Sequence, residues 1–347
     1  MMKNNRALTH ASGFGLVELM VSITLGLLLS AAVLQTFLAA NTSYRIQDSL
    51  SQIQESSRYA IHFLGQDLRM AGYMGCASPS SVSVNIISRN PPADVVFDLD
   101  TIVVGSDNVD TTNSFNAVGN TDVLSLRRAS NKSAQLTGNM ASDNANIQIV
   151  DNNLGLVAGA YVLITDCVNA DLFTATGVSR SAGKVTIAHA NDVNTTNKLS
   201  KPYGPDAEVF GFESINYFVR DTGRTTSGGN PIRALYIQKR TLGSAGANPD
   251  AYELVEGVEN LQVTYGEDTN DDRSIDRYVD GANVGSWADV LSVRVELLLA
   301  SNEDNVVGKT GAETAQEITF NGANVVNNDG RYRKVITSVF AIRNKLP

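Results

Sequence analysis

One carboxylate, Glu18, stands near the start of a run that is otherwise apolar enough to cross a membrane. From Leu19 to Tyr44 no residue is charged, and as a helix these 26 positions would extend about 39 Å. A hydrocarbon core is about 30 Å thick, so the run can span a bilayer with some tilt. A carboxylate near hydrocarbon is costly unless it is paired, protonated or held at the interface. Glu18 therefore predicts a partner for its charge.

A second group of side chains has the spacing of a cation site. Oxygen-bearing side chains stand at positions 1, 3, 5, 7 and 9 of one loop, with Ile275 at position 8: Asp268, Asn270, Asp272, Ser274 and Asp276. This spacing resembles an EF-hand or dockerin-type calcium loop, so Ca²⁺ is the one cofactor that the sequence suggests. Two positions depart from the pattern, because Arg273 replaces the turn glycine and Val279 replaces the bidentate carboxylate. The alternative is a solvated acidic hairpin loop.

Residues suited to catalysis are sparse. Beyond the first 13 residues the histidines are His62, in a helical stretch, and His189, beside a strand. Neither has a second ligand at His-x-x-x-His or Cys-x-x-Cys spacing, and no Gly-x-Ser-x-Gly motif or phosphate-binding loop occurs. We therefore expect structural histidines and predict that the chain is not an enzyme.

The N-terminal segment indicates export. Lys3, Arg6 and His10 precede the apolar run with no acidic residue, a pattern typical of a segment whose N-terminus stays in the cytoplasm. In an exported chain two cysteines favour a disulfide, here between Cys76 and Cys167; the alternative is two buried free thiols. A bridge across so long a loop contributes roughly 4 to 5 kcal/mol in the chain-entropy model.

Composition and charge limit the partners. The chain is 43% hydrophobic and 18% charged, as in an ordinary globular protein with one membrane-grade stretch. Its formal net charge is −9, and removal of residues 1–13 would lower Lys+Arg from 27 to 25 and give −11. No basic run or stripe offsets this charge, so a nucleic acid is not an expected partner.

The elements that position these residues begin with a long helix. Between Arg45 and Tyr73 apolar residues fall three, four, seven or eight apart and form one stripe: Ile46, Leu50, Ile53, Ile61, Leu64 and Leu68. No proline occurs between Phe14 and Ser78, which predicts one continuous helix of about 60 residues. Gly72 and Gly75 are stop signals. The second half of the helix is expected to lie on the rest of the chain.

Downstream the period of the apolar residues changes from 3.6 to 2, which predicts an antiparallel, half-buried sheet. The clearest alternation is Val293-Arg294-Val295-Glu296-Leu297. Clusters of Asn, Asp, Ser, Thr and Gly separate the expected strands and predict loops. The expected strands are 81–88, 95–104, 123–127, 161–165, 184–188, 215–220, 234–239, 261–265, 290–299 and 334–343.

The N-terminal residues resemble a known motif. Gly13-Phe14-Gly-Leu-Val-Glu18, after a short basic leader and before about twenty apolar residues, resembles the prepilin motif of type IV pilins and type II secretion pseudopilins. The resemblance implies that a prepilin peptidase cuts after Gly13 and methylates the amino group of Phe14. It also implies that Glu18 meets the charged N-terminus of a neighbouring subunit during assembly, a pair that specifies register more than it stabilises.

Four further segments narrow the resemblance to one family. Residues 69–76, 254–266, 287–299 and 339–344 resemble the PilW minor pilins, which are related to the J-type minor pseudopilins. The resemblance implies an α+β fold: a long N-terminal helix, transmembrane in its first half and amphipathic in its second, packed on an antiparallel pilin-like head. The expected division is a leader (1–13), a transmembrane or filament-core helix (14–44), an amphipathic helix (45–76) and a β-rich head (77–347).

The resemblance also implies a function in pilus assembly. Such subunits join other minor pilins and the major pilin at the pilus tip, prime assembly and present a tip adhesin. The expected location is the bacterial inner membrane with a periplasmic head, and then the pilus on the cell surface. Two alternatives remain: a J-type minor pseudopilin of a type II secretion system, and an exported binding protein with a conventional signal peptide cut after Ala32.

Overall fold

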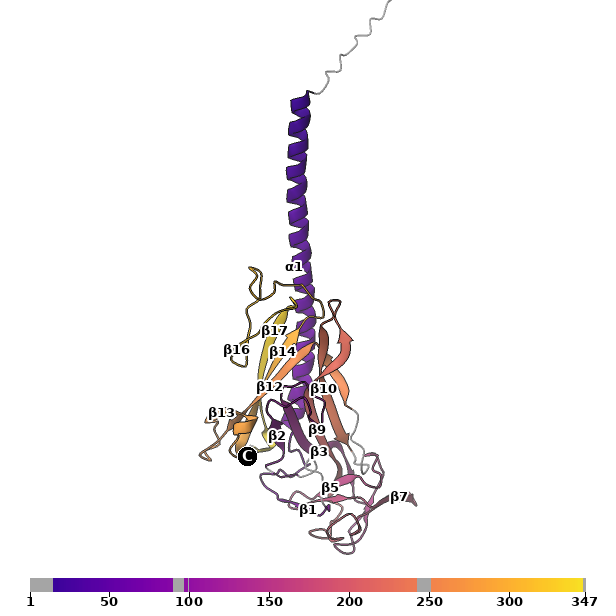
Figure 1. Cartoon of the computed structure of the whole chain (residues 1–347). Helices are drawn as coiled ribbons and strands as arrows, with labels where there is room; N and C mark the ends of the chain where they lie inside the picture. Colours follow the sequence, from indigo (N-terminus) through magenta and orange to yellow (C-terminus); the bar gives the residue numbers. More distant parts are fainter. Residues whose placement is uncertain (1–14, 90–96, 99, 242–250, 346–347) are drawn as a thin grey trace, which may run out of the picture.

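The computed structural model describes residues 15–89, 97–98, 100–241 and 251–345. One helix stands out from a head built of β-sheets (Figure 1). The predicted class, a long N-terminal helix on a mostly antiparallel β-rich head, is confirmed. One strand pair in the large sheet is parallel.

Helix α1 (Leu16–Met70) is unbroken over 55 residues, or about 80 Å. Gly72, with φ +75°, lies two residues beyond its end and takes the left-handed conformation that a glycine adopts without strain. The first half of α1 is exposed on all sides, whereas the second half buries one face against the head. Small residues are frequent on that face, which consists of Ser49, Ile53, Ser57, Ala60, Leu64, Gly65, Asp67 and Leu68.

The larger sheet has eight strands. Its long central strand, β9 (Glu208–Thr225), pairs with β10, β3 and β5, and the only parallel pair among the described strands is β1 with β6. The other strands are β1 (Val84–Ile86), β2 (Val103–Ser106), β3 (Val123–Gln135), β5 (Tyr161–Thr165), β6 (Ala170–Thr174), β10 (Pro231–Thr241) and β11 (Tyr252–Glu256).

A second sheet of four antiparallel strands lies beside α1, in the order β13-β12-β14-β17. Its strands are β12 (Val258–Glu267), β13 (Arg277–Asp280), β14 (Val290–Ala300) and β17 (Arg333–Ala341). The main core joins the buried face of α1 to both sheets, as Leu64, Leu68, Tyr217, Leu297 and Phe340 show. The helix is thus anchored by the same core that holds the head together.

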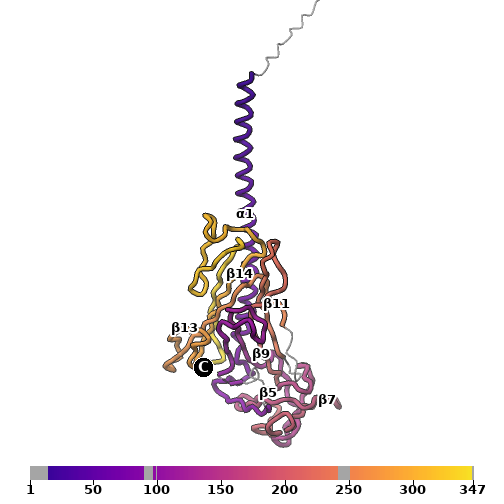
Figure 2. Tube along the Cα trace, in the orientation of Figure 1, coloured from indigo at the N-terminus to yellow at the C-terminus, as the bar shows by residue number. Residues whose placement is uncertain are grey.

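A smaller layer forms the end of the head that lies away from the exposed half of α1. Strands β4 (Ile147–Ile149), β7 (Gly177–Ser181) and β8 (Lys184–Ala188) make a three-stranded sheet with a separate core around Ile147, Phe173 and Ile187. Figure 2 shows these magenta segments at the far end, whereas the orange and yellow C-terminal segments run alongside the helix. The remaining short elements are β15 (Thr319–Phe320), β16 (Ala323–Asn324), η2 (Gly281–Asn283), η3 (Trp287–Asp289) and η4 (Arg343–Lys345).

Several predicted strand boundaries differ from the structure. Strands 161–165 and 184–188 are confirmed. Of the strand expected over 95–104, residues 95, 96 and 99 lie outside the described residues. The described strand β2 begins at Val103, because the Asp98 carbonyl accepts turn hydrogen bonds from the amides of Thr101 and Ile102. Strands β4, β6, β7, β11, β13, β15 and β16 were not predicted. They are short, and β6 contains Asp171 while β7 is mostly polar, so neither shows the expected apolar alternation.

Candidate functional site

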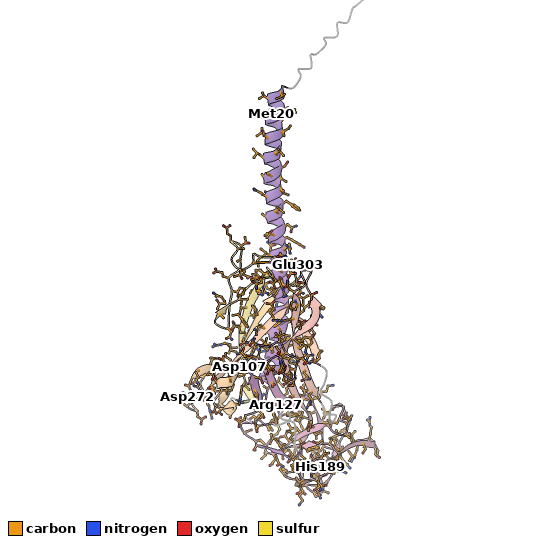
Figure 3. All side chains as sticks on the ribbon, viewed as in Figure 1. Met20, Asp107, Arg127, His189, Asp272 and Glu303 are labelled. Carbon is orange, nitrogen blue, oxygen red and sulfur yellow. A yellow bond between two sulfur atoms is a disulfide. The ribbon has the colours of Figure 1, made fainter. Side chains whose placement is uncertain are left out.

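The exposed half of α1 presents apolar side chains in every direction, as the sticks around Met20 show (Figure 3). This segment is long and apolar enough to cross a membrane, and none of it is buried in the head. Glu18 lies on it, exposed, and forms no ion pair within the described part of the chain. The predicted cleavage site, Gly13 and Phe14, lies outside the described residues. Cleavage, methylation and the role of Glu18 therefore stay predictions.

Arg45 marks the point at which α1 enters the head. Its guanidinium donates to the backbone carbonyls of Asp304 and Asn305 at 2.8 and 3.2 Å, and pairs with the Glu303 carboxylate at 3.2 Å. Glu303 lies where the helix meets the head in Figure 3. Because the ion pair is exposed, the two carbonyl bonds are the stronger part of this link.

A buried polar network fastens the second half of α1 to the large sheet. Asp67 accepts from Arg128 at 3.0 Å and from the Tyr217 hydroxyl at 2.6 Å. Arg128 also binds Glu213 at 2.9 Å, and Lys239 reaches the same carboxylate at 3.0 Å. Burial and the Asp67 carboxylate raise the pKa of Tyr217, so its hydroxyl remains a donor. The network fixes the helix along its axis as well as against the sheet.

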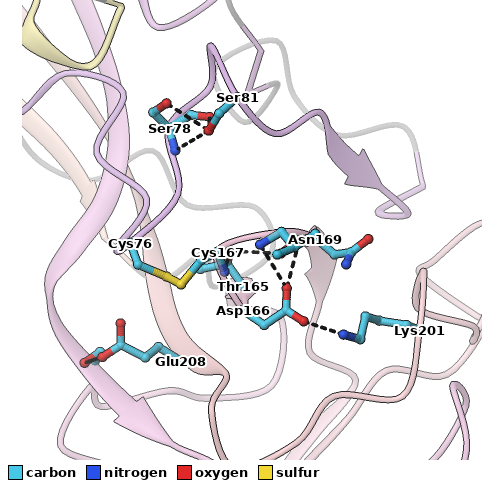
Figure 4. The surroundings of a disulfide bond; sticks show 11 residues. Cys76, Ser78, Ser81, Thr165, Asp166, Cys167, Asn169, Lys201 and Glu208 are labelled. Atoms are coloured by element: carbon cyan, nitrogen blue, oxygen red, sulfur yellow. Dashed lines mark hydrogen bonds and ion pairs between the residues drawn. A yellow bond between two sulfur atoms is a disulfide. The ribbon is translucent and has the colours of Figure 1, made fainter. Parts of the chain in front are cut away.

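The disulfide between Cys76 and Cys167 is present, as the sequence predicts. It joins the segment that follows α1 to the turn between β5 and β6 (Figure 4). Asp166 stabilises that turn by accepting from the backbone amides of Val168 and Asn169. Burial alone would raise the pKa of Asp166, but hydrogen bonds from Lys201 and from these amides outweigh it and lower the pKa.

The predicted calcium residues lie together in one loop between β12 and β13. Asp268 accepts from the backbone amides of Asp272 and Arg273, and Asp276 accepts from the amide and hydroxyl of Thr269. Arg273, at the glycine position of the pattern, has φ +68°, the left-handed conformation that the glycine would supply. Hydrogen bonds from Ser274 lower the pKa of Asp272. Within the described residues no three His, Cys, Asp or Glu side chains converge on a metal position, so calcium binding stays a prediction.

The two histidines of the described residues, His62 and His189, lie far apart. His62 is exposed on α1, edge-on to Phe63 at 5.6 Å between ring centroids. His189 is buried in the far end of the head and its Nε2 donates to the carbonyl of Ala145 at 2.9 Å. Neither contacts the other or a cysteine, so the described residues contain no arrangement of these side chains for nucleophilic catalysis.

A second buried ionic cluster was missed by the sequence analysis. Arg333 binds both Glu259 and Asp329, and Arg331, only 1% exposed, binds Glu259 at 2.9 Å. The cluster fastens the long segment before β17 to β12. Its signal in the sequence is the charge at every second position of Asp329-Gly-Arg331-Tyr-Arg333, which brings one acidic and two basic side chains close together along the chain.

Comparison with known proteins supports the resemblance drawn from the motifs. The chain is similar to the type IV-like pilin TTHA1219 from Thermus thermophilus at 11% identity and a TM-score of 0.34, over 85% of this chain and 98% of that one. This likeness is too weak to carry an argument. No curated protein matches. Residues 216–344 match the model of the PilW family, described as Type IV Pilus-assembly protein W. This match covers three of the four segments that resemble the PilW minor pilins in the sequence, residues 254–266, 287–299 and 339–344.

Proposed function

We propose that the chain is a minor pilin of a type IV pilus and that its role is structural. The observation that carries this proposal is the continuity of α1, whose exposed apolar half runs without a break into a half docked on the head. Such a helix suits a subunit that is held first in a bilayer and then in a bundle of helices, because both surroundings accept an apolar surface on all sides.

Processing follows from the N-terminal motif. A prepilin peptidase cuts after Gly13 and methylates Phe14, which leaves Glu18 four residues from the new N-terminus. In the assembled bundle Glu18 pairs with the Phe14 amino group of a neighbouring subunit. Each charge is costly alone in an apolar environment, so the pair favours one register between subunits.

The size of the head favours a place at the pilus tip. Residues 77–347 form a body too large to repeat every few ångströms along a shaft without crowding its neighbours. At the tip the chain joins other minor pilins and the major pilin, primes assembly and presents an adhesin. Before assembly it is held in the inner membrane with its head in the periplasm.

Deletion of the gene tests this proposal against the J-type pseudopilin. A minor pilin gives loss of surface pili and of twitching with normal enzyme secretion, whereas a pseudopilin gives the reverse. Mass spectrometry of the mature N-terminus tests the third interpretation. We expect methylated Phe14, and an N-terminus beyond position 30 would overturn the proposal in favour of a conventional signal peptide.

Glu18→Ala tests the assembly step. We expect leader cleavage to continue and incorporation into sheared pili to fall, because the unpaired Phe14 amino group then enters the bundle alone. Ser22→Ala is a matched control, since Ser22 lies one turn away and its hydroxyl only donates to the Glu18 backbone carbonyl. Normal incorporation of Glu18→Ala would contradict the pairing.

A further inference from the structure

Strand β17 forms one edge of the four-stranded sheet and pairs only with β14. In an antiparallel ladder the backbone groups of successive residues point alternately to the two sides of a strand. The Ile342 amide donates to Leu291, so the even-numbered residues of this segment bind β14. The odd-numbered residues of β17 therefore direct their backbone N–H and C=O groups away from the sheet.

The first of these outward positions is already paired. The Gln316 side-chain amide donates to the carbonyl of Arg333 at 2.7 Å and accepts from its N–H at 2.9 Å, as a neighbouring strand would. The next outward groups belong to Val335, Thr337, Val339 and Ala341, and no described residue binds them. Val339 is 53% exposed. An uncovered strand edge of this kind is a ready template for another extended chain.

Cations flank this edge on the side of α1. Phe340 of β17 contacts Gly65, and Arg69 lies over the Phe340 ring at 5.7 Å. Arg58 is exposed on α1, seven residues or about 10 Å before Gly65 and, at that spacing, on the same side of the helix. Arg343 follows the strand and is exposed. None of the three arginines forms an ion pair with a described residue, in a chain whose net charge is −9.

The charge decides between the candidate occupants. A second copy of this chain would bring the same cations against Arg58, Arg69 and Arg343, and antiparallel self-pairing of β17 would also point the two helices in opposite directions. The second of these arguments rests on the proposed function, because one membrane or one bundle holds all its helices in one direction.

We propose that the edge of β17 from Thr337 to Ala341 binds an extended, acidic segment of a different exported polypeptide, which adds to the sheet as a further strand. The outward backbone groups bind its main chain, and the flanking arginines select its acidic side chains. The inference deepens the proposed function by assigning a partner surface on the head, apart from the helix bundle.

The test uses the full chain in detergent micelles and a fluorescent synthetic heptapeptide in which valine alternates with glutamate. A second peptide with lysine in place of glutamate is the charge control. Val339→Pro removes one outward N–H without touching the bonds to β14, a position where proline is tolerated. Val339→Ala keeps that N–H and is the matched control for the lost side chain.

We expect the acidic peptide to slow amide hydrogen exchange at Thr337, Val339 and Ala341 at least tenfold. Val339→Pro and the lysine peptide should each weaken binding at least tenfold, whereas Val339→Ala should change it less than threefold. Equal binding by Val339→Pro or by the lysine peptide, or unchanged exchange, overturns the inference. The peptide assay needs no pilus, so a negative result rejects the binding edge and does not bear on the proposed function. The proposed function is tested by the loss of pili on gene deletion.

Discussion

Removal of the Cys76–Cys167 disulfide is expected to lower the free energy of unfolding, mainly by raising the conformational entropy of the unfolded chain. The two cysteines are 91 residues apart, and the chain-entropy model assigns a loop of that length about 4.6 kcal/mol at 25 °C. Little native structure depends on the bond itself. Gly72 donates to the Arg127 carbonyl at 2.8 Å and Ala129 to Tyr73 at 2.7 Å on one side, and the β5–β6 turn has its own bonds to Asp166 on the other.

The assay is urea unfolding of the full chain in detergent, comparing the wild type with the double variant Cys76→Ser/Cys167→Ser. We expect the free energy of unfolding to fall by about 4 kcal/mol and the melting temperature by roughly 10 °C. Wild type treated with reductant is the control and should match the untreated variant. Added reductant should have no effect on the variant. A loss of less than about 1 kcal/mol in the free energy of unfolding would refute the loop-entropy reasoning.

Three further perturbations test other parts of the structure. Asp67→Ala should lower the free energy of unfolding in urea by about 3 kcal/mol, because it leaves the Tyr217 hydroxyl and half of the Arg128 guanidinium without a partner. The double variant Asp67→Ala/Arg128→Met should recover part of that loss. Burial raises the pKa of Asp122 from 3.8 to about 7, so between these pH values the folded state binds more protons than the unfolded state. The free energy of unfolding should therefore fall as the pH rises from 4 to 7. Asp122→Asn should remove this pH dependence, and an unchanged dependence would mean that another group causes it. Terbium titration should show luminescence that is lost in Asp272→Ala if the acidic loop binds calcium, and the absence of Asp272-dependent binding would leave a solvated hairpin loop.

The long helix and the positions of most long strands could be predicted from local patterns. The apolar stripe through Ile53 and Leu64, the absence of proline and the glycines at 72 and 75 are all local, and they determine a helix that ends at Met70. In strands β5, β8, β12 and β14 the apolar residues are likewise dense or regular enough to predict a strand from the local sequence.

The polar links between elements could not be predicted in the same way. Asp67, Arg128 and Glu213 are far apart in sequence, and each looks like a surface charge in its own segment. They meet because α1, β3 and β9 pack against one another, which is a property of the topology. The open edge of β17 has the same origin, since the sequence predicts the strand and does not show which neighbours it lacks.

The docked half of α1 allows no axial slip, and this rigidity links the two proposed contact surfaces. A Cβ at Gly65 would lie 2.6 Å from the Phe340 ring, so only glycine fits beside that residue. A shift of one turn would bring Ile61 or Arg69 to this position and separate Asp67 from Arg128. Glu18 and Gly65 are 47 residues apart on one helix, or about 70 Å. A register set by Glu18 in the helix bundle therefore also fixes the position of the β17 edge along the bundle axis. A partner strand can pair with this edge only when the subunit occupies the correct axial position.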